Sequence, residues 1–106
     1  MPSTDGPANL EQGRALCQQG LFLDAVPYFE AALSATERTF GESAPELAEY
    51  MQDLGDVYAA VERPADSLRV FDRLYRLGES ILGSNHPQIV TVLWKMSILA
   101  ERLGLV

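Results

Sequence analysis

The stretch Phe40-Gly41-Glu42-Ser43-Ala44-Pro45-Glu46-Leu47 returns in altered form as Leu82-Gly83-Ser84-Asn85-His86-Pro87-Gln88-Ile89. Both copies run from an apolar residue through Gly and three polar or small residues to Pro, and then to an apolar residue. Gly41 and Gly83 are 42 residues apart, and so are Pro45 and Pro87. A fixed period of this size is typical of solenoid repeats. The sequence therefore predicts a stack of copies of one structural unit.

Apolar residues recur at helical spacing along the whole chain, and strand-like alternation is absent. Glycines after the apolar stripes are expected to end helices, and prolines just before the stripes are expected to begin them. Five helices are expected: about 7–19, 22–40, from just after 45 to 61, 64–82, and from just after 87 to about 103. Because the loops are short, sequential helices should be antiparallel neighbours.

A shift of 42 residues superimposes whole helices as well as loops. Gly13 falls on Gly55 and then on Ser97, and Phe29 falls on Phe71. We therefore expect a flexible segment over 1–6 and one helical repeat domain over 7–106. Its parts are repeat one over 7–41, repeat two over 44–83 and an unpaired terminal helix over 87–103.

This pattern resembles the tetratricopeptide repeat family. The residues that carry the resemblance are Gly13, Gly20, Ala25, Phe29 and Ala32 in the first repeat, and Leu54, Gly55, Tyr58, Ser67 and Phe71 in the second. The 42-residue period and the Gly-x-x-His-Pro form of 83–87 are similar to the longer variant in kinesin light chains. Asn9, Ser67 and Leu74 depart from the family pattern, and the third copy stops after its first helix.

The resemblance implies an all-α, right-handed solenoid in which the first helix of each pair lines a concave groove. It also implies binding of peptides or proteins, with no chemistry of its own. The clamp of Lys and Asn residues that some members use for C-terminal carboxylates is not present, since Arg14 is the only cation at groove positions in the first two repeats.

Composition excludes several other classes of protein. The net charge is −7, which argues against nucleic acid and anionic membrane surfaces as partners. The segment before Pro7 lacks the basic and apolar regions of a signal peptide, and no apolar run approaches a membrane span. The single cysteine, Cys17, leaves no internal disulfide, so a cytoplasmic location is expected.

Motifs for catalysis and cofactor binding are absent from the sequence. His86 is the only histidine, and its place before Pro87 indicates a loop residue. Cys17 has no base nearby in sequence and is interpreted as a half-buried structural residue. We expect no catalytic, cofactor-binding or metal-binding residues, so the chain is predicted not to be an enzyme. An enzyme site completed only in an oligomer is the remaining catalytic alternative.

Acidic residues are concentrated in the third helix. Residues 42–62 contain six acids and no Lys or Arg, and Glu46, Glu49, Asp53 and Asp56 share one helical face. Arg69, Arg73 and Arg76 form a basic row on the fourth helix. One interpretation is two solvated faces. The other is that Arg14, Glu49, Gln52 and Asp56 line the groove and favour a basic or amphipathic partner.

The last helix carries a second apolar stripe in addition to the one that should dock on the fourth helix. This stripe contains Val90, Trp94, Ile98 and Leu105. Three interpretations are open: a homodimer contact, a binding hot spot for another protein, and a stripe covered by Leu105, Val106 and the groove.

The sequence thus predicts a protein–protein interaction module, an adaptor or scaffold. The predicted partner-binding residues are Arg14, Glu49, Gln52, Asp56, Trp94 and Ile98. The alternative is a self-assembly unit that closes as a dimer or stacks into a filament through its last helix.

Overall fold

The computed structural model describes residues 1–105; Val106, the last residue of the expected domain, lies outside the described residues. Its five helices are α1 (Gly6–Gln18), α2 (Phe22–Phe40), α3 (Leu47–Ala60), α4 (Pro64–Leu82) and α5 (Pro87–Arg102). The described residues contain no strand, so the all-α prediction is confirmed.

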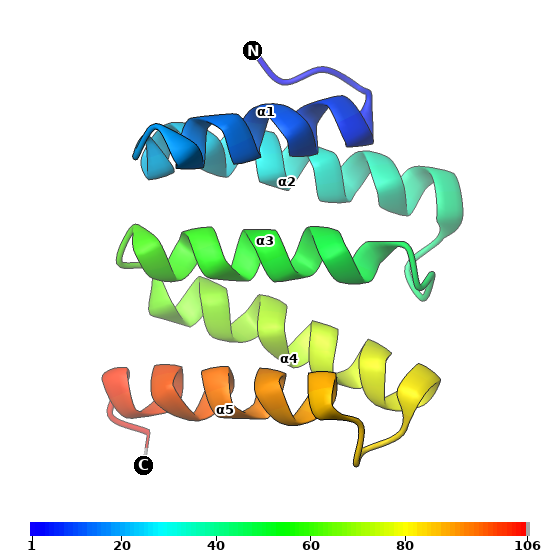
Figure 1. Ribbon diagram of the computed structural model, residues 1–106, viewed down its shortest axis with the longest axis vertical. Coiled ribbons are helices and arrows are strands. Elements are labelled where there is room, and N and C mark those ends of the chain that lie inside the picture. The colour runs from blue at the N-terminus through cyan, green and yellow to red at the C-terminus, as the bar shows by residue number, and fades with distance from the viewer. Residues whose placement is uncertain (106) are drawn as a thin grey trace.

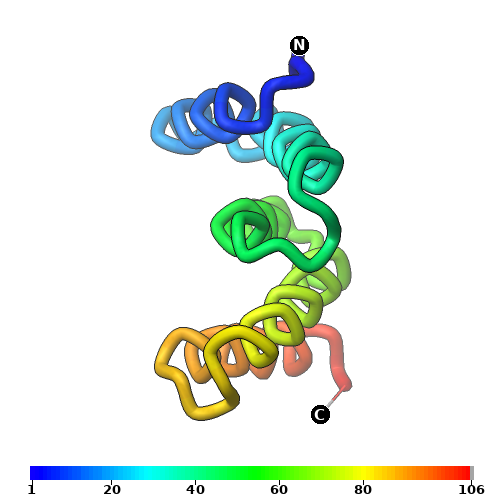
Figure 2. Tube along the Cα trace, turned by 90° about the vertical axis from the view of Figure 1, so that its right-hand side faces the viewer, coloured from blue at the N-terminus to red at the C-terminus, as the bar shows by residue number. Residues whose placement is uncertain are grey.

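Each helix packs against the next one along the chain, and the helices form a stack with the two termini at opposite ends (Figure 1). Viewed from the side, α1, α3 and α5 lie on one side of the stack, while α2 and α4 lie on the other (Figure 2). The molecule measures 37 × 29 × 18 Å. The first helices of successive repeats therefore share one face, as the repeat pattern predicts.

The core depends on close contacts between an aromatic ring and a glycine. The ring of Phe29 lies against Gly13 and that of Phe71 against Gly55, so close that a Cβ on either glycine would lie 2.6 Å from the ring. Both rings are buried. One continuous apolar cluster, from Leu10 to Leu99, joins all five helices.

The two repeated turns form the joints between successive repeats. Gly41 and Gly83 follow α2 and α4 with φ of 94° and 86°, a region that favours glycine. After the second turn, Pro87 opens α5 and the Nδ1 atom of His86 accepts a hydrogen bond of 3.2 Å from the N–H of Gln88. His86 is thus the N-cap of α5.

The first residues of the chain contact the first repeat. The side-chain amide of buried Asn9 accepts a hydrogen bond from the Ser3 N–H, at 2.9 Å, and donates one to the Ser3 carbonyl, at 2.8 Å. Asp5 caps α1 by accepting a hydrogen bond from the N–H of Ala8. The polar Asn9 at an apolar family position is explained by these bonds. Helix α1 begins at Gly6, one residue before the expected start.

None of the helices among the described residues combines the length and the apolarity that a membrane crossing requires.

Candidate functional site

The face shared by α1, α3 and α5 contains two hollows that lie on either side of α3. The first hollow, of about 350 Å³, lies between α1 and α3 and is also lined from α2. The second, of about 470 Å³, lies between α3 and α5, with α4 contributing to its lining. We refer to these two hollows and the part of α3 between them as the groove.

The first hollow is lined by both apolar and charged side chains. Phe22 and Phe29 contribute from α2, and Val57 and Ala60 from α3. The complete lining is Arg14, Cys17, Gln18, Phe22, Phe29, Asp53, Asp56, Val57 and Ala60. Phe22 is 41% exposed, so an aromatic surface is available for contact.

The second hollow has the same construction. Its apolar part comes from α4 and α5, including Leu74 and Val92. The complete lining is Ala48, Glu49, Gln52, Leu74, Gly78, Leu82, Gln88, Ile89, Thr91, Val92 and Lys95. Ile89 packs directly against Gly78 in this lining, so a Cβ on Gly78 would require the end of the Ile89 side chain to shift.

The acidic row of α3 is held by cations from both neighbouring first helices. Arg14 donates to Asp53 at 2.7 Å and lies 3.7 Å from Glu49. On the other side, Lys95 donates to Asp56 at 3.0 Å, and Gln52 donates to the same carboxylate at 3.1 Å. The groove therefore carries a row of oriented ion pairs rather than unopposed negative charge.

Burial changes the acidity of two groups in the first hollow. Desolvation raises the pKa of Asp53, and the hydrogen bond from Arg14 opposes this only in part. The pKa of the Cys17 thiol is raised by burial and, secondarily, by the charge of Asp53. A raised thiol pKa reduces the thiolate fraction, which makes Cys17 a poor nucleophile.

The arginines of α4 do not form ion pairs with the acidic row of α3. Arg69 and Arg76 pair with Asp66 and Asp72 of their own helix, and Arg73 pairs with Glu37 of α2. The basic row of α4 is thus engaged on the α2–α4 side of the stack.

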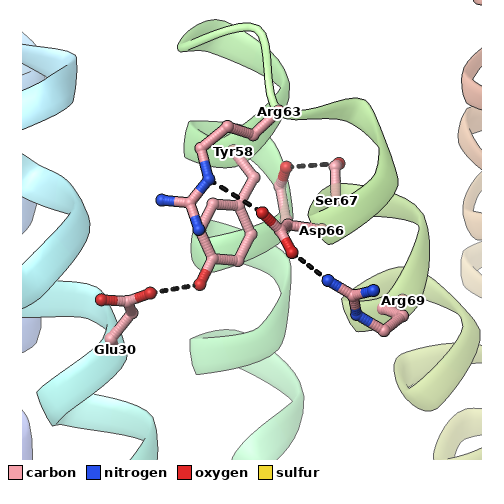
Figure 3. Close-up of polar contacts among 7 residues, drawn as sticks. Glu30, Tyr58, Arg63, Asp66, Ser67 and Arg69 are labelled. Carbon is pink, nitrogen blue, oxygen red and sulfur yellow. Dashed lines mark hydrogen bonds and ion pairs between the residues drawn. The ribbon is translucent and has the colours of Figure 1, made fainter.

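A further polar cluster joins α2, α3 and α4 (Figure 3). Tyr58 donates a hydrogen bond to Glu30, and the Arg63 guanidinium lies 4.5 Å from the centre of the Tyr58 ring. Arg63 also binds Asp66 at 2.8 Å and thereby lowers the pKa of that carboxyl. None of these residues lines either hollow, so we assign this cluster to the joint between the two repeats.

Four of the six predicted site residues lie together in the groove. Arg14 and Asp56 line the first hollow, and Glu49 and Gln52 line the second. Trp94 and Ile98 line neither hollow; both are exposed, Trp94 by 67%. The structure thus separates the predicted residues into two surfaces.

Sequence reasoning missed Asp53 and Lys95 as members of the groove. The signal was present, because the 42-residue shift places Lys95 on Asp53. Both residues bind the first helix of the preceding repeat, through Arg14–Asp53 and Asp56–Lys95, each pair 39 residues apart. The same contact is made twice with its charges reversed.

Within residues 1–105, no group of His, Cys, Asp or Glu side chains is arranged to hold a metal ion. Two pairs of polar groups in the groove, Arg14 with Asp53 and Asp56 with Lys95, bond to each other across helices.

The fold is that of an all-α helical-repeat protein, in which successive helix pairs stack along one axis. The chain belongs to the tetratricopeptide repeat family, whose model matches residues 7–80. No curated protein matches it in sequence. Repeats of this family are non-catalytic modules that generally mediate protein–protein interactions and scaffolding. The likeness to the kinesin-light-chain variant is compatible with this match and stays a prediction.

Proposed function

We propose that this chain is a non-catalytic adaptor or scaffold whose groove binds a peptide or a segment of another protein. The observation that carries the proposal is the pair of apolar hollows on the face shared by α1, α3 and α5. Hollows of this kind accept side chains, while the polar row between them can bond a partner's backbone and fix its register.

The partner's chemistry follows from the two kinds of surface in the groove. Apolar side chains of the partner would enter the hollows, and its polar groups would lie along α3. Glu49 is the most exposed carboxylate of the ion-paired row, with a side chain 61% exposed, and it would attract a basic residue. We therefore propose an amphipathic segment with at least one Lys or Arg between two apolar anchors.

We extend the proposal to the location of the protein in the cell and to the number of its folding units. We propose a cytoplasmic location, which rests on the use of a single cysteine, and one folding unit over 7–106. Self-assembly is a second candidate role, favoured by the exposed side chains of α5.

Selection of peptides from a random library displayed on phage, followed by affinity measurement, tests the groove. Ala60→Arg would obstruct the first hollow and Thr91→Arg the second, and both positions are exposed, so folding should be kept. Ala65→Arg is the matched control, because Ala65 is exposed on α4 and lines neither hollow.

We expect the two groove variants to weaken peptide affinity by about tenfold or more, the size typical of a lost interface anchor, and the control to leave it unchanged. Selected peptides that bind all three variants equally would show that the hollows are not the binding site.

A further inference from the structure

Helix α5 carries a row of exposed side chains on the side that faces away from α4. The row, called here the outer strip, consists of Val90, Leu93, Trp94, Ser97, Ile98 and Glu101, all exposed. Their spacing of three and four residues places them on one helical face. Ile89, Val92 and Leu99 on the opposite side are buried. Leu105 is 66% exposed and does not cover the strip, and Val106, also expected to cover it, lies outside the described residues.

The core of the molecule shows how this chain joins two helices: an aromatic ring sits over a small residue. Phe29 covers Gly13 and Phe71 covers Gly55. The next position in the 42-residue series is Ser97, which is exposed. Trp94 lies three residues away on the same strip. Helix α5 therefore presents an uncovered small residue beside an uncovered aromatic ring, although the Cβ and Oγ atoms of Ser97 would hold a ring farther away than the core glycines do.

We propose that the outer strip is a contact between two copies of this chain, related by a two-fold axis, with their α5 helices antiparallel. With the axis between Lys95 and Met96, Trp94 of each copy covers Ser97 of the other. The same axis packs Leu93 against Ile98. This large-on-small pairing makes the strip self-complementary, as a two-fold contact requires.

The charge distribution favours this end of the molecule as the contact. The chain has a net charge of −7, so two copies repel each other through most of their surfaces. Helix α5 adds little to this repulsion, because its single acid is Glu101 and its two cations, Lys95 and Arg102, are paired with Asp56 and Glu62. The outer strip itself contains only that one charge.

Glu101 also favours the antiparallel arrangement. The proposed axis places Glu101 beside Val90, in the first turn of the other α5. A carboxylate is stabilised near a helix N-terminus and destabilised near a C-terminus. A parallel pair would leave each Glu101 at the other helix's C-terminal end and would set the two Trp94 rings side by side.

At the opposite end of the stack, the position equivalent to Leu93 is polar and covered, which favours a closed dimer over a filament. Asn9 occupies the position of Leu93 two periods earlier, yet it is buried and both ends of its amide are bonded to Ser3. Asn9 at the N-terminal end is thus polar and buried, whereas Leu93 on α5 is apolar and exposed.

No residue of the outer strip lines either hollow, so this proposal goes beyond groove binding. The dimer proposal can be wrong while the groove proposal is right. A variant of Trp94 should leave groove affinity intact.

Sedimentation equilibrium over a wide concentration range tests the contact. We expect the mass to rise from 11.7 kDa toward twice that value. Trp94 is the only tryptophan, so its fluorescence should shift to shorter wavelength as the dimer forms, with the same midpoint. Trp94→Glu should weaken association by about tenfold or more. Leu23→Glu, at a position 70% exposed on α2, is the matched control and should associate normally.

Cysteine cross-linking in a Cys17→Ser background tests the direction of the helices. Val90 and Glu101 are about 16 Å apart along one helix at 1.5 Å per residue. The antiparallel pair predicts a disulfide between Val90→Cys and Glu101→Cys chains when they are mixed, and none in either chain alone, because the two Cα atoms must approach within about 7 Å.

Three results would overturn the proposal: a monomeric mass at every concentration, association that persists in Trp94→Glu, or cross-links between two Val90→Cys chains. A monomer whose Trp94 fluorescence shifts only when another protein's helix is added would assign the strip to that partner instead.

Discussion

At the scale of single residues, the fold depends on two glycines, Gly13 and Gly55, whose lack of a Cβ atom lets an aromatic ring pack against the helix backbone. Gly55 lets the Phe71 ring approach α3, and the Ser67 hydroxyl donates a 2.6 Å hydrogen bond to the Gly55 carbonyl beside it. Ser67 is fully buried, so the serine that departs from the family's small alanine is explained by this bond. The contact fixes the distance between α3 and α4.

Gly55→Ala should therefore destabilise the protein although alanine favours helices. Overpacking a filled core costs about 1–3 kcal/mol, and the helical preference returns about 1 kcal/mol, which leaves a net loss of up to about 2 kcal/mol. Urea unfolding measures this loss of stability. Adding Phe71→Leu should make Gly55→Ala less costly, since the two residues are in contact. A Gly55→Ala protein more stable than the parent would refute the contact.

Tyr58 should lower the free energy of unfolding as the pH becomes alkaline. Burial, and then the bond to Glu30, raises its pKa above the ordinary 10.0. Above about pH 10 the folded phenol therefore keeps a proton that the unfolded chain loses, and the free energy of unfolding falls as pH rises. Near pH 8, Tyr58→Phe should be less stable by about 1 kcal/mol, the worth of the hydrogen bond. Urea unfolding should show that difference narrowing toward pH 11; a constant difference would contradict it.

At the scale of helices and turns, the repeat pattern predicted most of the fold. Gly41, Gly83 and Pro87 marked helix boundaries, and α2 and α4 have the expected bounds. Helix α3 begins at Leu47 and ends at Ala60, inside its expected limits. The cap by Asp5 and the Ser3–Asn9 bonds were not predictable from the period, because they join residues with no counterpart in the other copies.

The turn after α3 has Glu62 where the corresponding turns after α1 and α5 have glycine. Gly20 and Gly104 end α1 and α5 with positive φ, and their counterpart after α3 is Glu62, with φ of 60°. A side chain in this conformation costs about 1 kcal/mol or more. The Arg102–Glu62 ion pair, 2.7 Å long, is largely exposed and offsets little of that.

Glu62→Gly should consequently stabilise the protein by about 0.5–1 kcal/mol, because glycine accepts positive φ without strain. Thermal and urea unfolding both measure this, and Arg102→Ala reports the ion pair separately. A loss of stability in Glu62→Gly beyond that of Arg102→Ala would show that the turn is not strained.

The groove was predictable in part, for a physical reason. Periodicity places Glu49, Gln52 and Asp56 on one helical face, and family geometry turns that face to the groove. Periodicity does not say which cation meets which acid, because Arg14–Asp53 and Lys95–Asp56 depend on how neighbouring repeats are rotated. Trp94 and Ile98 correspond to Gln52 and Asp56, but no further first helix lies beside them among the described residues to form a third hollow.

At the scale of the whole molecule, the two proposed binding surfaces differ in charge. The groove holds the ion-paired acidic row, while the outer strip of α5 is nearly uncharged. If both proposals hold, one chain would bind a partner in its groove and a second copy at its end.

The net charge of −7 makes the proposed groove binding sensitive to salt. A selected peptide with a central Lys should lose affinity between about 50 and 500 mM NaCl, whereas its Lys→Gln counterpart should change much less. Calorimetric titration measures both. Because Arg14 and Lys95 already oppose the acids, we expect a loss of only about threefold to tenfold; equal salt dependence of the two peptides would contradict this electrostatic account.

Groove binding is tested most directly by mapping backbone amide NMR shifts while a selected peptide is added. The largest changes should fall on α1, α3 and α5, at residues such as Gln18, Gln52 and Lys95 that line the two hollows. The exposed side of α4, around Arg69 and Arg76, should be unaffected. Shifts centred on α4, or on the outer strip around Trp94 alone, would contradict the claim that the groove is the binding site.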